Sequence, residues 1–158
     1  MSKIGLELER RLLDREITFF HFGRAQRKVN MCLKESVRRR DEFHRYYFLG
    51  QKEVLAEHYH RAMRYFDLAL ALRPKDGCTY NDKALCLAEE GKLNEALICF
   101  NEGIKRDSDC ASLYHNKGWL LHLLRKYKQA ILCFRKALEL EHNRPEALFS
   151  LADTYQCL

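Results

Sequence analysis

Histidine, cysteine and acidic residues are the side chains of this 158-residue chain that could support metal binding or catalysis. Glu57, His58 and His60 fall together in the segment EHYH, where two imidazoles and a carboxylate could hold a metal ion. This spacing is common in proteins and no second pair of ligands is apparent, so we expect no metal site. We also expect no cofactor, because the chain has no glycine-rich phosphate-binding loop.

The cysteines indicate a reducing environment. There are seven, an odd number without any CxxC pair, which favours free thiols that pack as small hydrophobes. The N-terminus lacks the pattern of a secretory or transit peptide, and no apolar run reaches the roughly 20 residues of a membrane span. We therefore expect a soluble protein inside the cell, in the cytoplasm, with the nucleus and the cilium left open.

Catalysis has little support in the sequence. Serine, histidine and aspartate occur without a nucleophile elbow or any other motif that would bring them together for chemistry. The formal net charge is +6, with basic stretches at 37–45 (VRRRDEFHR) and 125–128 (RKYK). These fall at an expected helix end, where cations are favourable, and in an expected turn. We therefore predict neither an enzyme nor a nucleic-acid interface.

The strongest pattern in the sequence is a repeat with a period of 34 residues. Three segments align without gaps, at 43–76, 77–110 and 111–144, and the tail at 145–158 matches the beginning of a fourth. Each repeat predicts two helices, A and B, joined by a short turn. The small number of prolines and glycines, two and seven, also favours long helices.

Residue size also recurs within the repeats. The eighth position is small, the twentieth is alanine, and the twenty-fourth is phenylalanine, followed three residues later by a small residue. In the middle repeat these positions hold Ala84, Ala96, Phe100 and Gly103. Large side chains that face small ones at helical spacing predict closely packed helix pairs.

This pattern of sizes resembles that of the tetratricopeptide repeat family. The resemblance covers residues 43–158 and rests on YxxxA/G followed by A, F and A/G, with ALALRP and ALELEHN at the ends of two repeats. The chain departs from the family in keeping the terminal proline, Pro74, in the first repeat only. The resemblance implies an all-α, right-handed α-solenoid of antiparallel helix pairs, whose A helices line a concave groove.

Residues 1–42 do not match the repeat. Two apolar stripes at helical spacing, Ile4–Phe20 and Ala25–Val37, predict a divergent pair of helices that is broken near Gly23. A stack of repeats exposes an apolar end that must be capped. We therefore expect this pair to cover helix A of the first repeat.

The resemblance places a candidate peptide-binding groove on the second, fifth, sixth, ninth, twelfth and thirteenth positions of the A helices. We expect Trp119 and Tyr47 to anchor a partner peptide there. The candidate residues are Tyr47, Phe48, Gln51, Asn81, Asp82, Leu85, Glu89, His115, Asn116, Trp119, His122, Phe149 and Asp153.

The resemblance also bears on the partner. One variant of the family grips the C-terminal carboxylate of chaperone peptides with lysine and arginine side chains. The matching positions here hold neither of these residues; they are Tyr47, Gln51, Asp82, Ser112 and Asn116. We therefore expect no carboxylate clamp, and instead a protein or peptide partner that is apolar or modestly basic.

The tail PEALFSLADTYQCL predicts helix A of an incomplete fourth repeat. Leu148, Ala152 and Tyr155 would then lack a covering B helix, so we expect a shortened form of a longer array or end-to-end association through this helix. The function predicted is an interaction scaffold or adaptor within a larger assembly. The alternatives are a nucleic-acid-associated protein and the regulatory repeat region of a larger enzyme.

Overall fold

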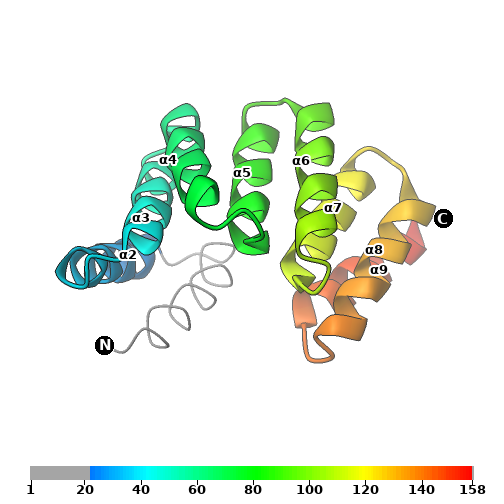
Figure 1. Ribbon diagram of the computed structural model, residues 1–158. Helices are drawn as coiled ribbons and strands as arrows, with labels where there is room; N and C mark the ends of the chain where they lie inside the picture. Colours follow the sequence, from blue (N-terminus) through cyan, green and yellow to red (C-terminus); the bar gives the residue numbers. More distant parts are fainter. Residues whose placement is uncertain (1–21, 158) are drawn as a thin grey trace. The chain divides into compact units, whose positions relative to one another are not determined.

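The computed structural model describes residues 22–157, and all the regular secondary structure in this range is helical (Figure 1). The helices are α2 (Phe22–Arg38), α3 (Glu42–Leu55), α4 (Tyr59–Leu72), α5 (Gly77–Glu89), α6 (Leu93–Arg106), α7 (Ala111–Leu123), α8 (Tyr127–Leu140) and α9 (Pro145–Gln156). Helices α3 and α4 pack as a pair, as do α5 with α6 and α7 with α8. The predicted all-α fold of helix pairs is confirmed.

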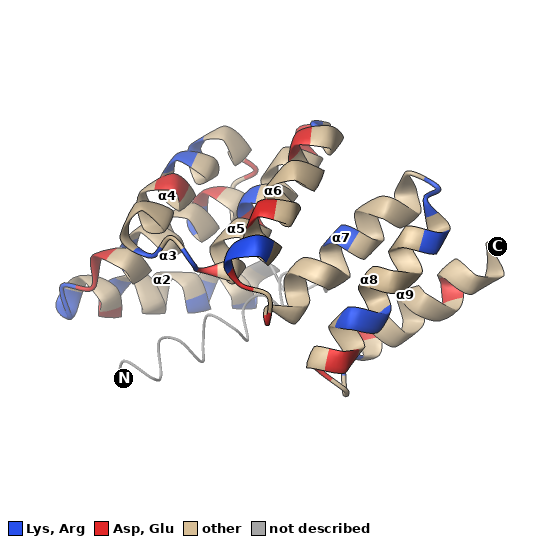
Figure 2. Ribbon diagram, turned by 45° about the vertical axis from the view of Figure 1, so that its right-hand side comes forward, with Lys and Arg blue, Asp and Glu red and all other residues tan. Residues whose placement is uncertain are grey.

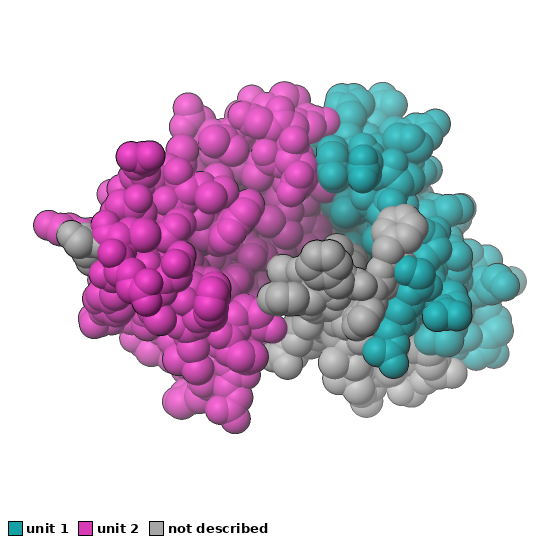
Figure 3. Space-filling view, turned by 180° about the vertical axis from the view of Figure 1, so that it is seen from behind, with its two compact units in different colours: residues 1–74 teal, residues 75–158 magenta. Residues whose placement is uncertain are grey.

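The chain divides into two compact units, residues 1–74 and 75–158 (Figure 3). In the first unit α2 packs against α3, and in the second α9 packs against α8. The predicted stripe Ile4–Phe20 lies outside the described residues. Helix α2 begins at Phe22, next to Gly23, and the residues before it lie outside the described part of the chain, so the break near Gly23 stays a prediction. Val37 is exposed at the end of α2, so it is wrong to count it with the buried face of that helix.

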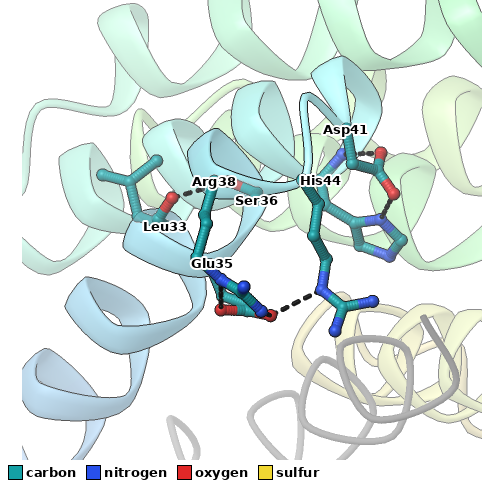
Figure 4. A network of polar contacts seen from close by, with 7 residues as sticks. Leu33, Glu35, Ser36, Arg38, Asp41 and His44 are labelled. Carbon is teal, nitrogen blue, oxygen red and sulfur yellow. Dashed lines mark hydrogen bonds and ion pairs between the residues drawn. The ribbon is translucent and has the colours of Figure 1, made fainter. Parts of the chain in front are cut away.

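Aspartate side chains begin the A helices of the first two repeats. Asp41 accepts hydrogen bonds from the backbone N of His44 at 3.2 Å and from its ring Nδ1 at 2.8 Å (Figure 4). Burial acts to raise the pKa of Asp41, but the two hydrogen bonds from His44 outweigh it, so the pKa is lowered. Asp76 caps α5 in the same way and accepts from the backbone N of Thr79 at 2.8 Å.

The interior of each helix pair is built from one large ring and one small residue. Phe66, Phe100 and Phe134 are fully buried at equivalent positions of the B helices. Gly50 on α3 faces the ring of Phe66, and Gly118 on α7 faces the ring of Phe134. The small residues of the sequence pattern therefore let the A helix approach its partner closely, as predicted.

The turns between A and B helices each contain a residue with left-handed backbone conformation. Glu57, Gly91 and Arg125 occupy the same position of successive repeats, with φ of 58°, 76° and 56°. Only glycine adopts this conformation without a steric penalty, because it lacks a Cβ atom. The turn geometry is thus set by the repeat, and Gly91 is the residue best suited to it.

We expect Gly91→Ala to lower the free energy of unfolding by about 1 kcal/mol, because alanine is strained at positive φ. Gly23→Ala is the matched control: an added Cβ meets nothing within 4 Å at either glycine, but Gly23 lies in α2 without positive φ. Denaturant unfolding followed by circular dichroism measures both. Equal effects of the two substitutions would show that the turn is not strained.

Candidate functional site

The A helices of the second unit present a lattice of side chains. Helix α7 packs between α5 and α9. Residues spaced by four along a helix share one face, so the fifth, ninth and thirteenth positions of these helices form three rows. We call the nine residues in these rows the A-helix face: Asn81, Leu85, Glu89, His115, Trp119, Leu123, Phe149, Asp153 and Cys157.

Apolar side chains on this face lie open to solvent. Trp119 is 40% exposed, Leu123 54% and Phe149 76%. Leu85 on α5 is half-buried, and the acidic Glu89 and Asp153 are exposed. An exposed indole flanked by aliphatic and acidic groups can bury an apolar side chain of a ligand and attract a cation beside it.

An amide hydrogen bond ties α5 to α7 beneath this face. Asn116 Nδ2 donates to Asn81 Oδ1 at 2.8 Å, and Asn81 Nδ2 donates to Asp82 Oδ1 at 3.2 Å. Asn81 and Asp82 are buried, and Asn116 is half-buried. These three predicted groove residues therefore hold the helices in register and offer little of their surface to a ligand.

A second polar link joins α7 to α9. His122 Nδ1 lies 2.8 Å from Thr154 Oγ1, and that hydroxyl donates its own proton to the backbone oxygen of Ser150 at 2.6 Å. Because a hydroxyl has one proton, Thr154 must accept from His122, so Nδ1 of the ring carries a proton. His122 Nε2 lies 3.5 Å from a carboxylate oxygen of Asp153, so these two predicted groove residues lie side by side.

The predicted groove residues of the first unit are buried. Tyr47, Phe48 and Gln51 are closed off from solvent, and Gln51 Nε2 donates to the Tyr47 hydroxyl at 3.0 Å. The Tyr47 ring lies edge-on to Phe48, with centroids 5.3 Å apart, and 6.0 Å from Phe66 of α4. Tyr47 belongs to the core of the helix pair, so its interpretation as an exposed peptide anchor is wrong.

The candidate metal and nucleophilic residues are held in other contacts. His58 Nδ1 lies 3.0 Å from Glu53 Oε2, and the part of the chain from 22 to 157 contains no group of three or more potential metal ligands.

Burial raises the pKa of the thiols of Cys86 and Cys133. A raised thiol pKa lowers the fraction of reactive thiolate, so these two cysteines pack as small hydrophobes.

The basic residues near the end of α2 are paired with acids. Glu35 accepts from Arg38 at 2.7 Å and from Arg39, and these bonds hold the pKa of Glu35 well below its usual range (Figure 4). Arg45 donates to Glu42 at 3.0 Å. Figure 2 shows Lys and Arg interspersed with Asp and Glu along the helices. These pairs reduce the charge that the stretch 37–45 could present to a phosphate backbone.

Arg144, which no sequence motif marks, is buried at the start of α9. Arg144 is 8% exposed, and its guanidinium donates to Ser112 Oγ and to a carboxylate oxygen of Glu141, each at 3.1 Å. One signal could have drawn attention to it. Asp41 and Asp76 precede α3 and α5, whereas a cation precedes α9.

Within residues 22–157, none of the helices combines the length and the hydropathy needed to cross a membrane.

Comparison with known proteins agrees with this architecture. A family model described as tetratricopeptide repeat matches residues 111–144, and a second with the same description matches residues 79–110. The Hsp70-Hsp90 organizing protein of Triticum aestivum is 24% identical over 99 residues, which are 63% of this chain. The match spans only 17% of that relative.

Two solved structures share the fold. The first TPR of Spaghetti (RPAP3), bound to the HSP90 peptide SRMEEVD, superposes with a TM-score of 0.67 and 20% identity, covering 73% of this chain and 92% of that one. The Arabidopsis OM64 TPR domain superposes with a TM-score of 0.68 and 19% identity, and the match covers 75% of this chain and 98% of that one. These matches show that residues 79–144 are tetratricopeptide repeats and that the chain has the fold of TPR domains.

Proposed function

We propose that this chain is an interaction adaptor that binds a segment of a partner protein on the A-helix face of the second unit. The observation that carries the proposal is the exposure of Trp119 and Leu123 side by side on α7, with Phe149 on the neighbouring α9. Solvent-exposed aromatic and aliphatic groups on one rigid surface are typical of binding sites.

The comparisons support peptide binding. The RPAP3 domain with the same fold is bound to an HSP90 peptide, and the wheat relative is an Hsp70-Hsp90 organizing protein. In our proposal this chain, too, receives a short peptide segment on its A helices and thereby joins a larger assembly.

The charges on the surface suggest the composition of the segment. Trp119 and Leu123 offer an apolar contact, and the exposed carboxylates of Glu89 and Asp153 stand on the helices to either side. We infer a partner segment with an apolar residue over Trp119 and a basic residue near these acids. Complementary charge would fix the orientation and speed of association more than it raises affinity.

Trp119→Ala tests the proposal. Short peptides selected against the wild-type chain from a random library are the probe, and fluorescence anisotropy of a labelled peptide gives the Kd. We expect Trp119→Ala to weaken binding by about 2 kcal/mol, roughly 30-fold, since buried aromatic anchors dominate such interfaces. Leu132→Ala is the control, because Leu132 is 66% exposed but lies on α8, outside the A-helix face.

Two results would count against the proposal. Selection that yields no peptide binding to the folded wild type would remove it, and so would equal affinities of the Trp119→Ala and Leu132→Ala variants. Circular dichroism of each variant shows that the helices are retained. Because Trp119 is the single tryptophan of the chain, its fluorescence reports directly on peptide contact in the wild type.

A further inference from the structure

Two apolar side chains on the B helices of the second unit lie open to solvent. Ile98 on α6 is 68% exposed and Leu132 on α8 is 66% exposed. Both stand at the twenty-second position of their repeats. The residues just before them make the inward contacts: Ile131 is buried, and Leu97 packs against the core cluster of α7 and α8. The interior of the unit is therefore filled without Ile98 and Leu132.

The first repeat shows that the fold does not need an apolar residue at this position. Arg64 stands there on α4 and is exposed, directly after the buried Met63. The arginine is hydrated, whereas an exposed isoleucine or leucine leaves apolar surface in water, and covering that surface is favourable. The second unit thus repeats, on two successive B helices, an apolar residue that its own packing does not explain.

Charged residues follow these apolar residues along the same face of each helix. The twenty-sixth and twenty-ninth positions hold Glu102 and Lys105 on α6, and Lys136 and Glu139 on α8. Residues spaced by four and by seven share one face of a helix. Acid precedes base along α6, and base precedes acid along α8 (Figure 2). When equivalent positions of α6 and α8 face each other, acid therefore meets base at both positions.

The contacts that these charges already make lie within one helix. Lys136 Nζ donates to Glu139 at 2.9 Å, and Arg106 Nε donates to Glu102 at 2.7 Å. The side chains of Glu102, Lys136 and Glu139 stay 38%, 46% and 65% exposed. Exposed pairs of this kind contribute little to stability, because water competes for both partners. The same groups can therefore meet a second set of charges.

We propose that two copies of this chain associate through α6 and α8, with α6 of each copy against α8 of the other. Ile98 then covers Leu132 of the second copy, and an acid meets a base at each of the next two positions. As B helices of successive repeats, α6 and α8 run in the same direction, so a two-fold axis along them forms both contacts at once and closes the dimer. We call the six residues of this contact the B-helix face: Ile98, Glu102, Lys105, Leu132, Lys136 and Glu139.

A second copy is the occupant that the charges favour, because the chain itself carries both complementary halves of the surface. When α6 faces α6 in the same register, or α8 faces α8, like charges meet, which is unfavourable. The contact involves a few exposed side chains on each helix, so we expect a weak dimer with a micromolar Kd.

The B-helix face shares no residue with the A-helix face, so the inference does not depend on the proposed function. A dimer would carry two A-helix faces and would bind a partner with two suitable segments more tightly than one copy does.

Sedimentation velocity of the full chain tests the association, at about 5 to 500 μM to bracket a micromolar Kd. A reducing agent prevents a disulfide through Cys157, whose thiol is exposed. The sedimentation coefficient should rise with concentration. Leu132→Glu should raise the Kd about tenfold or more, because it places an acid against apolar and acidic groups of α6. Leu68→Glu is the control, since Leu68 is an exposed leucine on α4 of the first unit.

Two outcomes of this experiment would overturn the proposal. A wild-type chain that stays monomeric over the whole range would show that a different protein, or none, covers Ile98 and Leu132. Equal effects of Leu132→Glu and Leu68→Glu would show that a dimer forms elsewhere on the chain.

Exchanging charges tests the pairing of α6 with α8. One variant combines Glu102→Lys with Lys105→Glu, and the other combines Lys136→Glu with Glu139→Lys. Each keeps the net charge and leaves opposite charges three residues apart on its helix, and circular dichroism checks that the helices are retained. Each variant alone should associate about tenfold more weakly than the wild type, because like charges then meet in both contacts.

An equimolar mixture of the two variants should associate as the wild type does, since opposite charges meet again between the two different chains. Failure of the mixture to associate would overturn the pairing, and so would undiminished association of either variant alone.

Dilution of the wild-type chain gives a readout that needs no variant. Methyl NMR signals of Ile98 and Leu132 should shift with concentration, whereas those of Leu148, which is exposed on α9, should stay constant. Shifts of Leu148 without shifts of Leu132 would place the contact at the end of the repeat array and overturn the proposal.

Discussion

Phe134→Ala is expected to lower the free energy of unfolding by about 3–5 kcal/mol, the range for a phenylalanine removed from a core. Phe134 is fully buried with Leu121 and Ala130, and Leu97 and Leu151 pack against this cluster from the helices on either side. Its ring also fills the space beside Gly118. The cavity would therefore weaken the contacts of α8 with both α7 and α9.

Leu132→Ala supplies the comparison for this variant. Leu132 lies two residues earlier on α8 but is exposed, so its truncation should change stability by no more than about 0.5 kcal/mol. Guanidinium unfolding can be followed by circular dichroism for all helices and by Trp119 fluorescence for α7. If Phe134→Ala lowered the free energy of unfolding by less than about 1 kcal/mol, the repeat would tolerate the cavity left by the missing ring.

Gly50→Leu should destabilise the first unit by about 3 kcal/mol through overpacking. A Cβ atom at Gly50 would already clash with the ring of Phe66, which is fully buried and cannot move aside freely. The gain in helix propensity on replacing glycine is about 1 kcal/mol and does not offset this clash. Gly50→Ala should be milder, because the equivalent position of the next repeat is Ala84.

Gly23→Leu is the matched control for the overpacked variant, since a Cβ at Gly23 meets no atom within 4 Å. It should leave the free energy of unfolding unchanged or raise it slightly, because leucine favours a helix more than glycine does. Urea unfolding monitored by circular dichroism compares Gly50→Leu and Gly23→Leu with the wild type. Similar midpoints for Gly50→Leu and Gly23→Leu would refute the close approach of α3 to Phe66.

Much of the fold follows from periodicity. The recurrence of Phe66, Phe100 and Phe134 with small residues at fixed distances predicted helix pairs, and the structure buries all three rings. Local patterns of this kind are visible in sequence because each repeat makes the same contacts with its neighbours. The bounds of α2, Phe22–Arg38, were less visible in the sequence, because residues 1–42 lack the repeat.

The candidate site was harder to predict than the fold. The register places both Tyr47 and Phe149 at the fifth position of an A helix, yet the first is fully buried and the second is 76% exposed. Position within a repeat fixes the direction of a side chain, but its burial depends on which neighbours stand beside it. Trp119 was identified from the sequence and is exposed, whereas Tyr47 is packed among the rings of Phe48 and Phe66.

The sequence by itself determined the repeat, the helix pairs and the face on which Trp119 lies. These features depend on spacing along the chain, which the hydrophobic and size patterns record directly. Only the tertiary structure decided that Arg144 is buried against Ser112 with an unsatisfied Nε, because 32 residues separate the two in the chain. Contacts between side chains of different helices depend on packing, and no local pattern in the sequence specifies them.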